Sequence, residues 1–460
     1  MWRQDDNTNK GAYLEVSSDS NAEVAPQQGI IGSTWNLLNS IIGAPMITIP
    51  YYVAVCGWSF GFVLLWLFAL MSFATLVLEH KLARDVGAKS LDELCTLAFG
   101  SKGSYAFNIS TFLYNYGSFI GGLLIIGDTV PHLLRHLTED YHAVRTWTMF
   151  LTVAATTPFA MRSDIAHLSF LGVLCFSACM LLTLCLMYML LHEHSPNNGD
   201  ASEALTWPER GDSPRLGFLH ALGGFTYLFT CQDVAFPIAN ALTDNSTYRF
   251  SVVSLLTMIL ATSLLTAAAS SAAMLFGSDA SRMHDNVLAN FAPPCPREVH
   301  DGILPSGARC STDGMELVIT NLCRGIIVFA VLASTPQSLY MPRQAVQSLL
   351  VQRLLVGANP SVLETSAKIT TLLLILVGLI VALLTTSLSG VFSLVGGVAG
   401  TVIATILPCS AWIKLADAES WPFYRAQKGV WLSLFGIGVF AIGSSVLGTF
   451  YPRLIPGAFT

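Results

Sequence analysis

The sequence predicts an all-α, polytopic membrane protein with about eleven transmembrane helices. Of its 460 residues, 53% are hydrophobic and only 11% are charged, whereas about 25% of the residues of a soluble domain are charged. The mean hydropathy is +0.58. Apolar runs of about 20 residues, long enough to cross a bilayer as helices, recur along most of the chain. The net charge of -6 argues against a nucleic-acid partner.

The expected spans follow one another with short polar connections. They are residues 29–53, 57–79, 105–135, 146–161, 165–191, 216–240, 250–277, 317–341, 369–388, 390–414 and 429–451. Residues 1–28 are polar and acidic without an apolar core, so we expect a disordered cytosolic tail and no removable signal peptide. Lys and Arg are more numerous in the segments that lie inside when the N-terminus is cytosolic, which favours that orientation.

Two of these spans carry helix-breaking residues near their middle. The first contains NLLNSIIGAPMITIP, with Gly43, Ala44 and Pro45 at membrane depth. The sixth contains GGFTYLFTCQDVAFP, in which a polar run from Thr230 to Asp233 precedes Pro237. Backbone groups freed by a break are tolerated only where they face protein or a watery cavity. A matched pair of breaks therefore indicates a transport site at the membrane midplane.

The positions of the breaks also predict an internal repeat. Each break opens a unit of five spans, residues 29–191 and 216–414, and a unit with an odd number of spans enters the membrane in the opposite direction to the one before it. The expected transmembrane domain, 29–451, is thus a 5+5 inverted repeat followed by one extra helix, 429–451.

Four stretches of the chain resemble a known family. They are NLLNSIIGAPMITIP, FLYNYGSFIGGLLIIGDTVPHLL, FTCQDVAFPIANAL, and MPRQAVQSLL followed by SLVGGVAGTVIATILPCSAWIKL. Together they are similar to the sodium-coupled neutral amino acid transporters, solute carrier family 38, of the amino acid and auxin permease superfamily. The resemblance implies a leucine-transporter-like fold and secondary active transport without a cofactor. Pro45 and the Gln232-Asp233 pair depart from the family pattern.

The breaks supply what a neutral amino acid needs, because half-helix ends present free N-H and C=O groups. We expect Gly43, Ala44 and Pro45 to lie beside the substrate carboxylate. The opposite wall is expected from three residues of the sixth span: Phe225, Thr230 and Cys231. Tyr114 and Tyr116 of the third span either cap this pocket or pack elsewhere.

A sodium site is expected in the eighth span, where Ser334 and Thr335 precede Pro336. Because proline has no N-H, a carbonyl near Val331 or Leu332 is left free. The resemblance implies that Asn39 and Ile42 of the first span complete the site. The alternative is that both hydroxyls bond their own helix, as most membrane Ser and Thr do.

Three ionisable residues within spans are further candidates. Asp128, with His132 one turn on, either relays protons or ends the third helix. Asp233 lies within the second break, where it could hold an ammonium group, carry a proton or pair with Arg324. Cys295 and Cys310 share the loop 278–314, which the topology places outside the cell or in a lumen, where a disulfide is reasonable.

The leading hypothesis is a symporter of neutral L-amino acids that uses a sodium gradient. One alternative is a proton-coupled relative of vacuolar or lysosomal membranes, and another is a transporter-like amino acid sensor. The membrane of residence is then the plasma membrane or a vacuolar or lysosomal membrane. Because the sequence holds no HExxH, phosphate-binding loop or nucleophile elbow, we expect neither an enzyme nor an ATP-driven pump.

Overall fold

The structure, a computed structural model, describes residues 28–134, 140–161, 169–192, 217–276, 283–291, 314–353, 359–416, 421 and 424–450. These residues are helical or connect helices, apart from an isolated parallel bridge between Gln28 and Leu242. The disulfide expected between Cys295 and Cys310 lies outside the described residues, as do the N-terminal tail and most of the loop 278–314.

The first half of the chain forms α1 (Ile30–Ile41), η1 (Ala44–Thr48), α2 (Ile49–Cys56), α3 (Trp58–Val86), α4 (Leu91–Phe99), α5 (Ser101–Leu133), α6 (Tyr141–Ala160) and α7 (Ser169–His192). The second half forms α8 (Gly217–Phe229), α9 (Gln232–Ala241), α10 (Thr247–Phe276), η5 (Val287–Ala289), α11 (Gly314–Ser338), α12 (Tyr340–Arg353), α13 (Pro360–Leu384), α14 (Leu388–Val395), η6 (Gly396–Gly400), η7 (Val402–Ile406), α15 (Leu407–Leu415) and α16 (Tyr424–Phe450).

Every expected span coincides with one of these helices or with consecutive ones, but the count of about eleven is not confirmed. Seven helices of the described residues are long and apolar enough to cross a membrane, or eight if the bent pair of α1 with η1 and α2 is one span. Two of the three remaining expected spans, the fifth and the sixth, fall short for physical reasons. The sixth span is divided by its break into the two short helices α8 and α9, and the described apolar part of α7 is only Phe176–Leu191.

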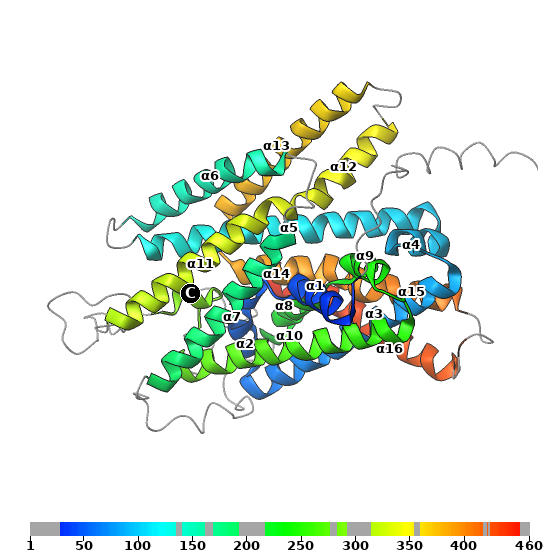
Figure 1. Cartoon of the computed structure of the whole chain (residues 1–460), viewed down its shortest axis with the longest axis horizontal. Helices are drawn as coiled ribbons and strands as arrows, with labels where there is room; N and C mark the ends of the chain where they lie inside the picture. The colour runs from blue at the N-terminus through cyan, green and yellow to red at the C-terminus, as the bar shows by residue number, and fades with distance from the viewer. Residues whose placement is uncertain are drawn as a thin grey trace, which may run out of the picture.

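Helices of the first repeat pack against their counterparts in the second. The second span contacts the seventh (α3 on α10), the third contacts the eighth (α5 on α11), and the fourth contacts the ninth (α6 on α13). The first span meets the sixth twice, α2 on α8 and α1 on α9. Figure 1 shows the broken helices near the centre, with α6 and α13 along one edge. This pairing is what two units related by a two-fold axis would produce.

Close helix approach at the centre depends on glycine. A Cβ atom on Gly223 of α8 would overlap the Ser393 carbonyl of α14, and one on Gly224 would overlap the ring of Tyr52. On α5, Gly117 and Gly121 likewise face side chains of α14. Small residues let membrane helices approach backbone to backbone, so these glycines bring α5, α8 and α14 together around the breaks.

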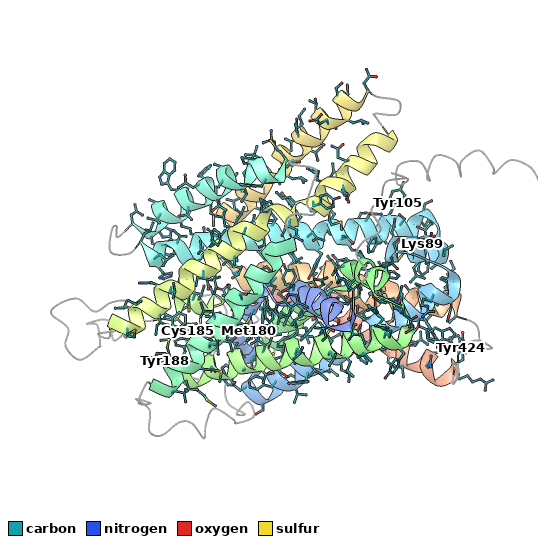
Figure 2. The ribbon with its side chains drawn as sticks, in the orientation of Figure 1. Lys89, Tyr105, Met180, Cys185, Tyr188 and Tyr424 are labelled. Atoms are coloured by element: carbon teal, nitrogen blue, oxygen red, sulfur yellow. The ribbon has the colours of Figure 1, made fainter. Side chains whose placement is uncertain are left out.

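One helix, α4, was not expected as an element. Its start is capped by side chains: Ser90 Oγ accepts the Glu93 N-H at 3.1 Å, and Glu93 accepts the Lys89 N-H at 2.7 Å. Leu94 and Cys95 lie on its buried face, and α4 packs along α5. In Figure 2, Lys89, Tyr105 and Tyr424 mark one end of the bundle, while Tyr188 of α7 lies toward the other. Two segments that the sequence places inside, those holding Lys89 and Tyr424, therefore lie at the same end.

Candidate functional site

The first predicted break is present. After Ile41 the chain leaves the α-helix and changes direction by 56° between the two halves. Pro45 stands in the first turn of η1, where its missing N-H leaves no hydrogen bond unmade. The Gly43 carbonyl accepts the Met46 N-H at 3.0 Å and the thiol of Cys179 on α7 at 3.6 Å. The break therefore lies against α7, and η1 also contacts α5, α8 and α14.

The second break falls within the polar run of the sixth span. α8 ends at Phe229 and α9 begins at Gln232, so Thr230 and Cys231 lie outside both helices. Their side chains are buried, with 1% and 0% exposed. Interrupting a helix here frees carbonyl groups in a buried environment, and each such group costs free energy unless it finds a donor.

Side chains of two neighbouring helices supply those donors. The hydroxyl of Tyr114 on α5 donates to the Tyr227 carbonyl at 2.9 Å and to the Thr230 carbonyl at 3.0 Å. Ser72 on α3 donates to the Phe229 carbonyl at 2.7 Å. The break is thus held in a defined shape by α3 and α5, neither of which belongs to the sixth span.

Gln232 closes the same network from the other side of the break. Its Oε1 accepts the N-H of Cys231 at 2.9 Å, and its Nε2 donates to the hydroxyls of Ser72 and Thr75, both at 3.2 Å. The Gln232 side chain is fully buried. This residue departs from the family pattern, and here it fastens the start of α9 to α3.

The predicted pocket residues lie in different surroundings. Phe225 is fully buried and packs against the rings of Tyr52 and Phe68, with centroids 6.1 and 6.0 Å away. It therefore faces α2 and α3. Tyr114 lies at the second break, whereas Tyr116 donates to the Leu374 carbonyl of α13 at 2.8 Å. The expectation that Tyr116 caps the pocket is not supported, because its hydroxyl is bound on another face of α5.

The hydroxyls expected to bind sodium converge on one carbonyl. Thr335 Oγ1 donates to the Val331 carbonyl at 2.6 Å, and Ser334 Oγ donates to the same oxygen at 3.1 Å. In this arrangement both hydroxyls bond their own helix. Ile42 is buried and Asn39 is half-buried in the last turn of α1. α1 and α11 both pack against α7.

Asp128 forms an ion pair that the sequence analysis did not foresee. Its carboxylate accepts from Arg145 of α6 at 2.6 Å, and the same guanidinium donates to the Thr385 carbonyl at 2.9 Å. Arg145 was expected in a loop outside the membrane, but α6 begins at Tyr141 and includes it. The pair joins α5, α6 and the end of α13.

Arg324 is not paired with Asp233, in contrast to one of the sequence hypotheses. The Arg324 guanidinium donates to the Leu288 carbonyl at 3.2 and 2.9 Å and to the Phe291 carbonyl at 3.2 Å. It thereby holds the segment around η5 against α11. Asp233 lies in the first turn of α9, within 3.5 Å of the Asn115 amide of α5. The correction follows from tertiary packing, which brings the two charges to different neighbours.

One buried acid escaped the sequence analysis. Glu79 on α3 is 0% exposed, and neither of its carboxyl oxygens has a hydrogen-bond partner. It interacts electrostatically with Asp233. The expected second span ended at residue 79, which treated Glu79 as a boundary charge. α3 in fact continues to Val86, so Glu79 is a fully buried carboxyl within a candidate membrane-spanning helix, a type of residue that marks a candidate functional site.

The chain is similar to known membrane transporters along most of its length. The family model described as transmembrane amino acid transporter protein matches residues 27–451. The chain is 22% identical to the sodium-coupled neutral amino acid transporter 7 of Xenopus laevis over 91% of its own length and 87% of that relative. It is 23% identical to the vacuolar amino acid transporter 2 of Saccharomyces cerevisiae, over 85% of this chain and 78% of that one.

Two solved structures share the fold. The crystal structure of MhsT in complex with L-phenylalanine gives a TM-score of 0.54 at 15% identity, covering 92% of this chain and 100% of MhsT. An Eremococcus coleocola manganese transporter gives 0.57 at 12% identity, covering 96% and 94%. At such low identity the likeness shows the fold alone. It confirms the predicted inverted-repeat, leucine-transporter-like architecture.

Proposed function

The chain belongs to the transmembrane amino acid transporter family, and from this premise we propose that it carries a neutral L-amino acid between its two helix breaks, coupled to a sodium gradient. Membership of the family makes it an integral, multi-pass amino acid transporter and not an enzyme. The proposal concerns the class of amino acid, the site and the coupling ion.

The observation that carries the site assignment is the pair of breaks. η1 packs directly against α8, so the backbone around Gly43 and Pro45 lies across from the sixth span. An amino acid carboxylate would be met by the half-helix N-terminus at η1, whose N-H groups carry partial positive charge. Phe225, Thr230 and Cys231 supply a wall that holds no charge, which favours an uncharged substrate side chain.

Sodium coupling is proposed from the eighth span. The Val331 carbonyl and the hydroxyls of Ser334 and Thr335 form a compact group of three oxygens. A sodium ion requires several uncharged or weakly charged oxygen ligands. If each hydroxyl rotates away from the carbonyl, all three oxygens can face one ion, and α1 would add the carbonyl of Ile42 with support from Asn39.

Uptake into proteoliposomes tests both parts of the proposal. The purified protein should take up radiolabelled L-alanine, L-leucine or L-glutamine, and an inward sodium gradient should increase the uptake. Thr335→Ala should raise the sodium concentration for half-maximal uptake by about tenfold, the effect of losing about 1.4 kcal/mol of ion binding. Equal uptake with and without the sodium gradient would refute sodium coupling. If the protein took up none of the neutral amino acids, the proposed substrate class would be refuted.

A proton-coupled transporter of an internal membrane is the second candidate. The observation that favours it is the buried Glu79 beside the second break, a group that could carry a proton. The fungal relative is, by its name, vacuolar. Fluorescence microscopy of the tagged protein in its own cells would distinguish the plasma membrane from a vacuolar or lysosomal membrane.

A further inference from the structure

Glu79 lies on the same face of α3 as Ser72 and Thr75, the residues that hydrogen-bond to the second break. Ser72, Thr75 and Glu79 are spaced by three and four residues, which places them one above another on a helix. Gln232 donates to the first two. Glu79, one turn further along, is just as deeply buried but has no donor on either oxygen.

Among the residues that the structure describes, the groups that face Glu79 do not include a cation. Asp233 of α9, Cys231 of the break and Cys95 of α4 interact with it electrostatically. No Lys, Arg or His of the described residues reaches it within salt-bridge distance. On α4, burial raises the pKa of Cys95 to about 12, so this thiol stays neutral.

One ring nitrogen of His80, the next residue along α3, is bound away from Glu79, and the other, Nδ1, is buried without a partner. Its Nε2 lies 2.7 Å from Asn245 Oδ1, and its ring stacks on Phe250 at a centroid distance of 4.4 Å. The positive charge of Arg84, one turn on, acts on His80. The surroundings of Glu79 therefore offer a second carboxyl group, thiols and apolar side chains.

Such surroundings decide the protonation state. An ionised carboxylate buried without a partner costs several kcal/mol, and a second carboxylate close by adds repulsion. The neutral acid avoids both costs. We infer that Glu79 is a proton-binding site of the transport cycle, protonated while the second break is closed and deprotonated when movement of α9 away from α3 admits water.

Deprotonation of Glu79 needs no reactant other than water. The O-H bond of the acid breaks, the electron pair stays on the carboxylate, and the proton passes to water. The inference rests on the proposed transport function and adds a coupling proton to it. Glu79 lies two turns before the end of α3 at Val86, on the side of the bundle marked by Lys89, so release toward that end is the shorter route.

A proton fits this place better than sodium. The Ser72 and Thr75 hydroxyls already donate to backbone carbonyls and accept from Gln232. Too few oxygens are left for the ligands that a sodium ion needs. The described residues also contain no group of three or more His, Cys, Asp or Glu able to hold a metal ion.

The experiment separates coupling from transport. Full-length protein in proteoliposomes, with equal sodium on both sides, receives radiolabelled L-alanine, L-leucine or L-glutamine. Two modes are measured: exchange against the same amino acid inside at equal pH, and accumulation driven by a pH gradient of about one unit, alkaline inside. With one coupled proton, that gradient supports up to about tenfold accumulation, since 1.4 kcal/mol corresponds to a factor of ten.

Glu79→Gln, which mimics the protonated acid, should keep exchange within about twofold of the wild type and lose the accumulation. The matched control is Glu364→Gln on α13, a surface residue paired with Lys368, which should keep both modes. Accumulation by Glu79→Gln would overturn the inference, and so would loss of exchange, because a neutral side chain should still allow the carrier to turn over. Wild-type exchange without any effect of the pH gradient would refute the coupling proton alone, whereas no wild-type exchange would refute the proposed transport function.

A second measurement does not depend on a variant that folds. Dicyclohexylcarbodiimide is apolar and reacts with protonated carboxyl groups, adding to them to give an N-acylurea. Peptide mass spectrometry of the labelled wild type should locate the adduct at Glu79, with yield falling as the pH rises, and not at Glu364. An unlabelled Glu79 would overturn the inference.

Discussion

Removing the hydroxyl of Tyr114 should loosen the second break. This single O-H serves the carbonyls of Tyr227 and Thr230, at 2.9 and 3.0 Å. In Tyr114→Phe both carbonyls lose that donor while the ring keeps its packing on Tyr227, 5.0 Å between centroids. A buried polar group left without its partner costs about 1–3 kcal/mol, and partners found within a membrane protein reduce this toward about 0.6 kcal/mol.

We take about 1.4 kcal/mol as the working value. It corresponds to a tenfold change in the equilibrium between the closed second break and an open form in which Cys231 is exposed. Cys231 reports on that equilibrium, because its thiol lies in the break and is 0% exposed when the break is closed. The rate at which N-ethylmaleimide labels it is then proportional to the open population. Peptide mass spectrometry should show Cys231 of Tyr114→Phe labelled about tenfold faster than in the wild type.

Tyr116→Phe is the matched control. It makes the same substitution on the same helix and also removes a hydrogen bond to a carbonyl, but that carbonyl belongs to Leu374 of α13. Its Cys231 labelling rate should equal that of the wild type. The reasoning fails if Tyr114→Phe labels at the wild-type rate, or if Tyr116→Phe accelerates labelling to the same extent.

Three further predictions concern packing, charge and topology. Gly224→Ala should lower the free energy of unfolding by about 1–3 kcal/mol, because the added Cβ overlaps a buried tyrosine ring of α2. In the control Gly436→Ala the added Cβ meets nothing within 4 Å, so this variant should be as stable as the wild type or more stable. The melting temperatures of the detergent-purified variants compare them, and equal values would contradict the packing argument. Asp128→Asn alone should destabilise the protein more than Asp128→Asn combined with Arg145→Gln. Only the single variant leaves a partly buried guanidinium without its carboxylate. The same melting measurement compares the two, and a double variant less stable than the single one would contradict this reasoning. Asn245-Ser246-Thr247 is an N-glycosylation sequon. With a cytosolic N-terminus it faces the cytosol and stays unmodified. A mass shift on glycosidase treatment that disappears in Asn245→Gln would therefore reverse the topology.

The broken spans show how far local sequence reaches. Gly43 and Pro45 placed the first break, and the polar run after Phe229 placed the second, because a helix cannot continue through residues that withhold or compete for its hydrogen bonds. The sequence did not reveal what satisfies the freed carbonyls. Their donors, Tyr114 and Ser72, come from helices more than a hundred residues away along the chain.

For the charged residues, the sequence predicted the candidates but not their partners. Their presence in apolar spans marked Asp128, Asp233 and Arg324 as candidates, but which partner each meets depends on helix rotation and depth. The structure pairs Asp128 with Arg145 and directs Arg324 to backbone carbonyls. Glu79 was missed because the end of a span cannot be located to within a helical turn from hydropathy alone.

The sequence by itself determined that this chain is an inverted repeat of membrane helices with two breaks, because apolar length, helix-breaking residues and their matched positions are local properties. Only the tertiary structure decided which side chains line and hold those breaks. A membrane helix exposes several faces of similar hydrophobicity, and the face that turns inward is chosen by contacts with helices distant in the sequence. For that reason the placement of Tyr114, Gln232 and Glu79 around the second break emerged only from the assembled fold.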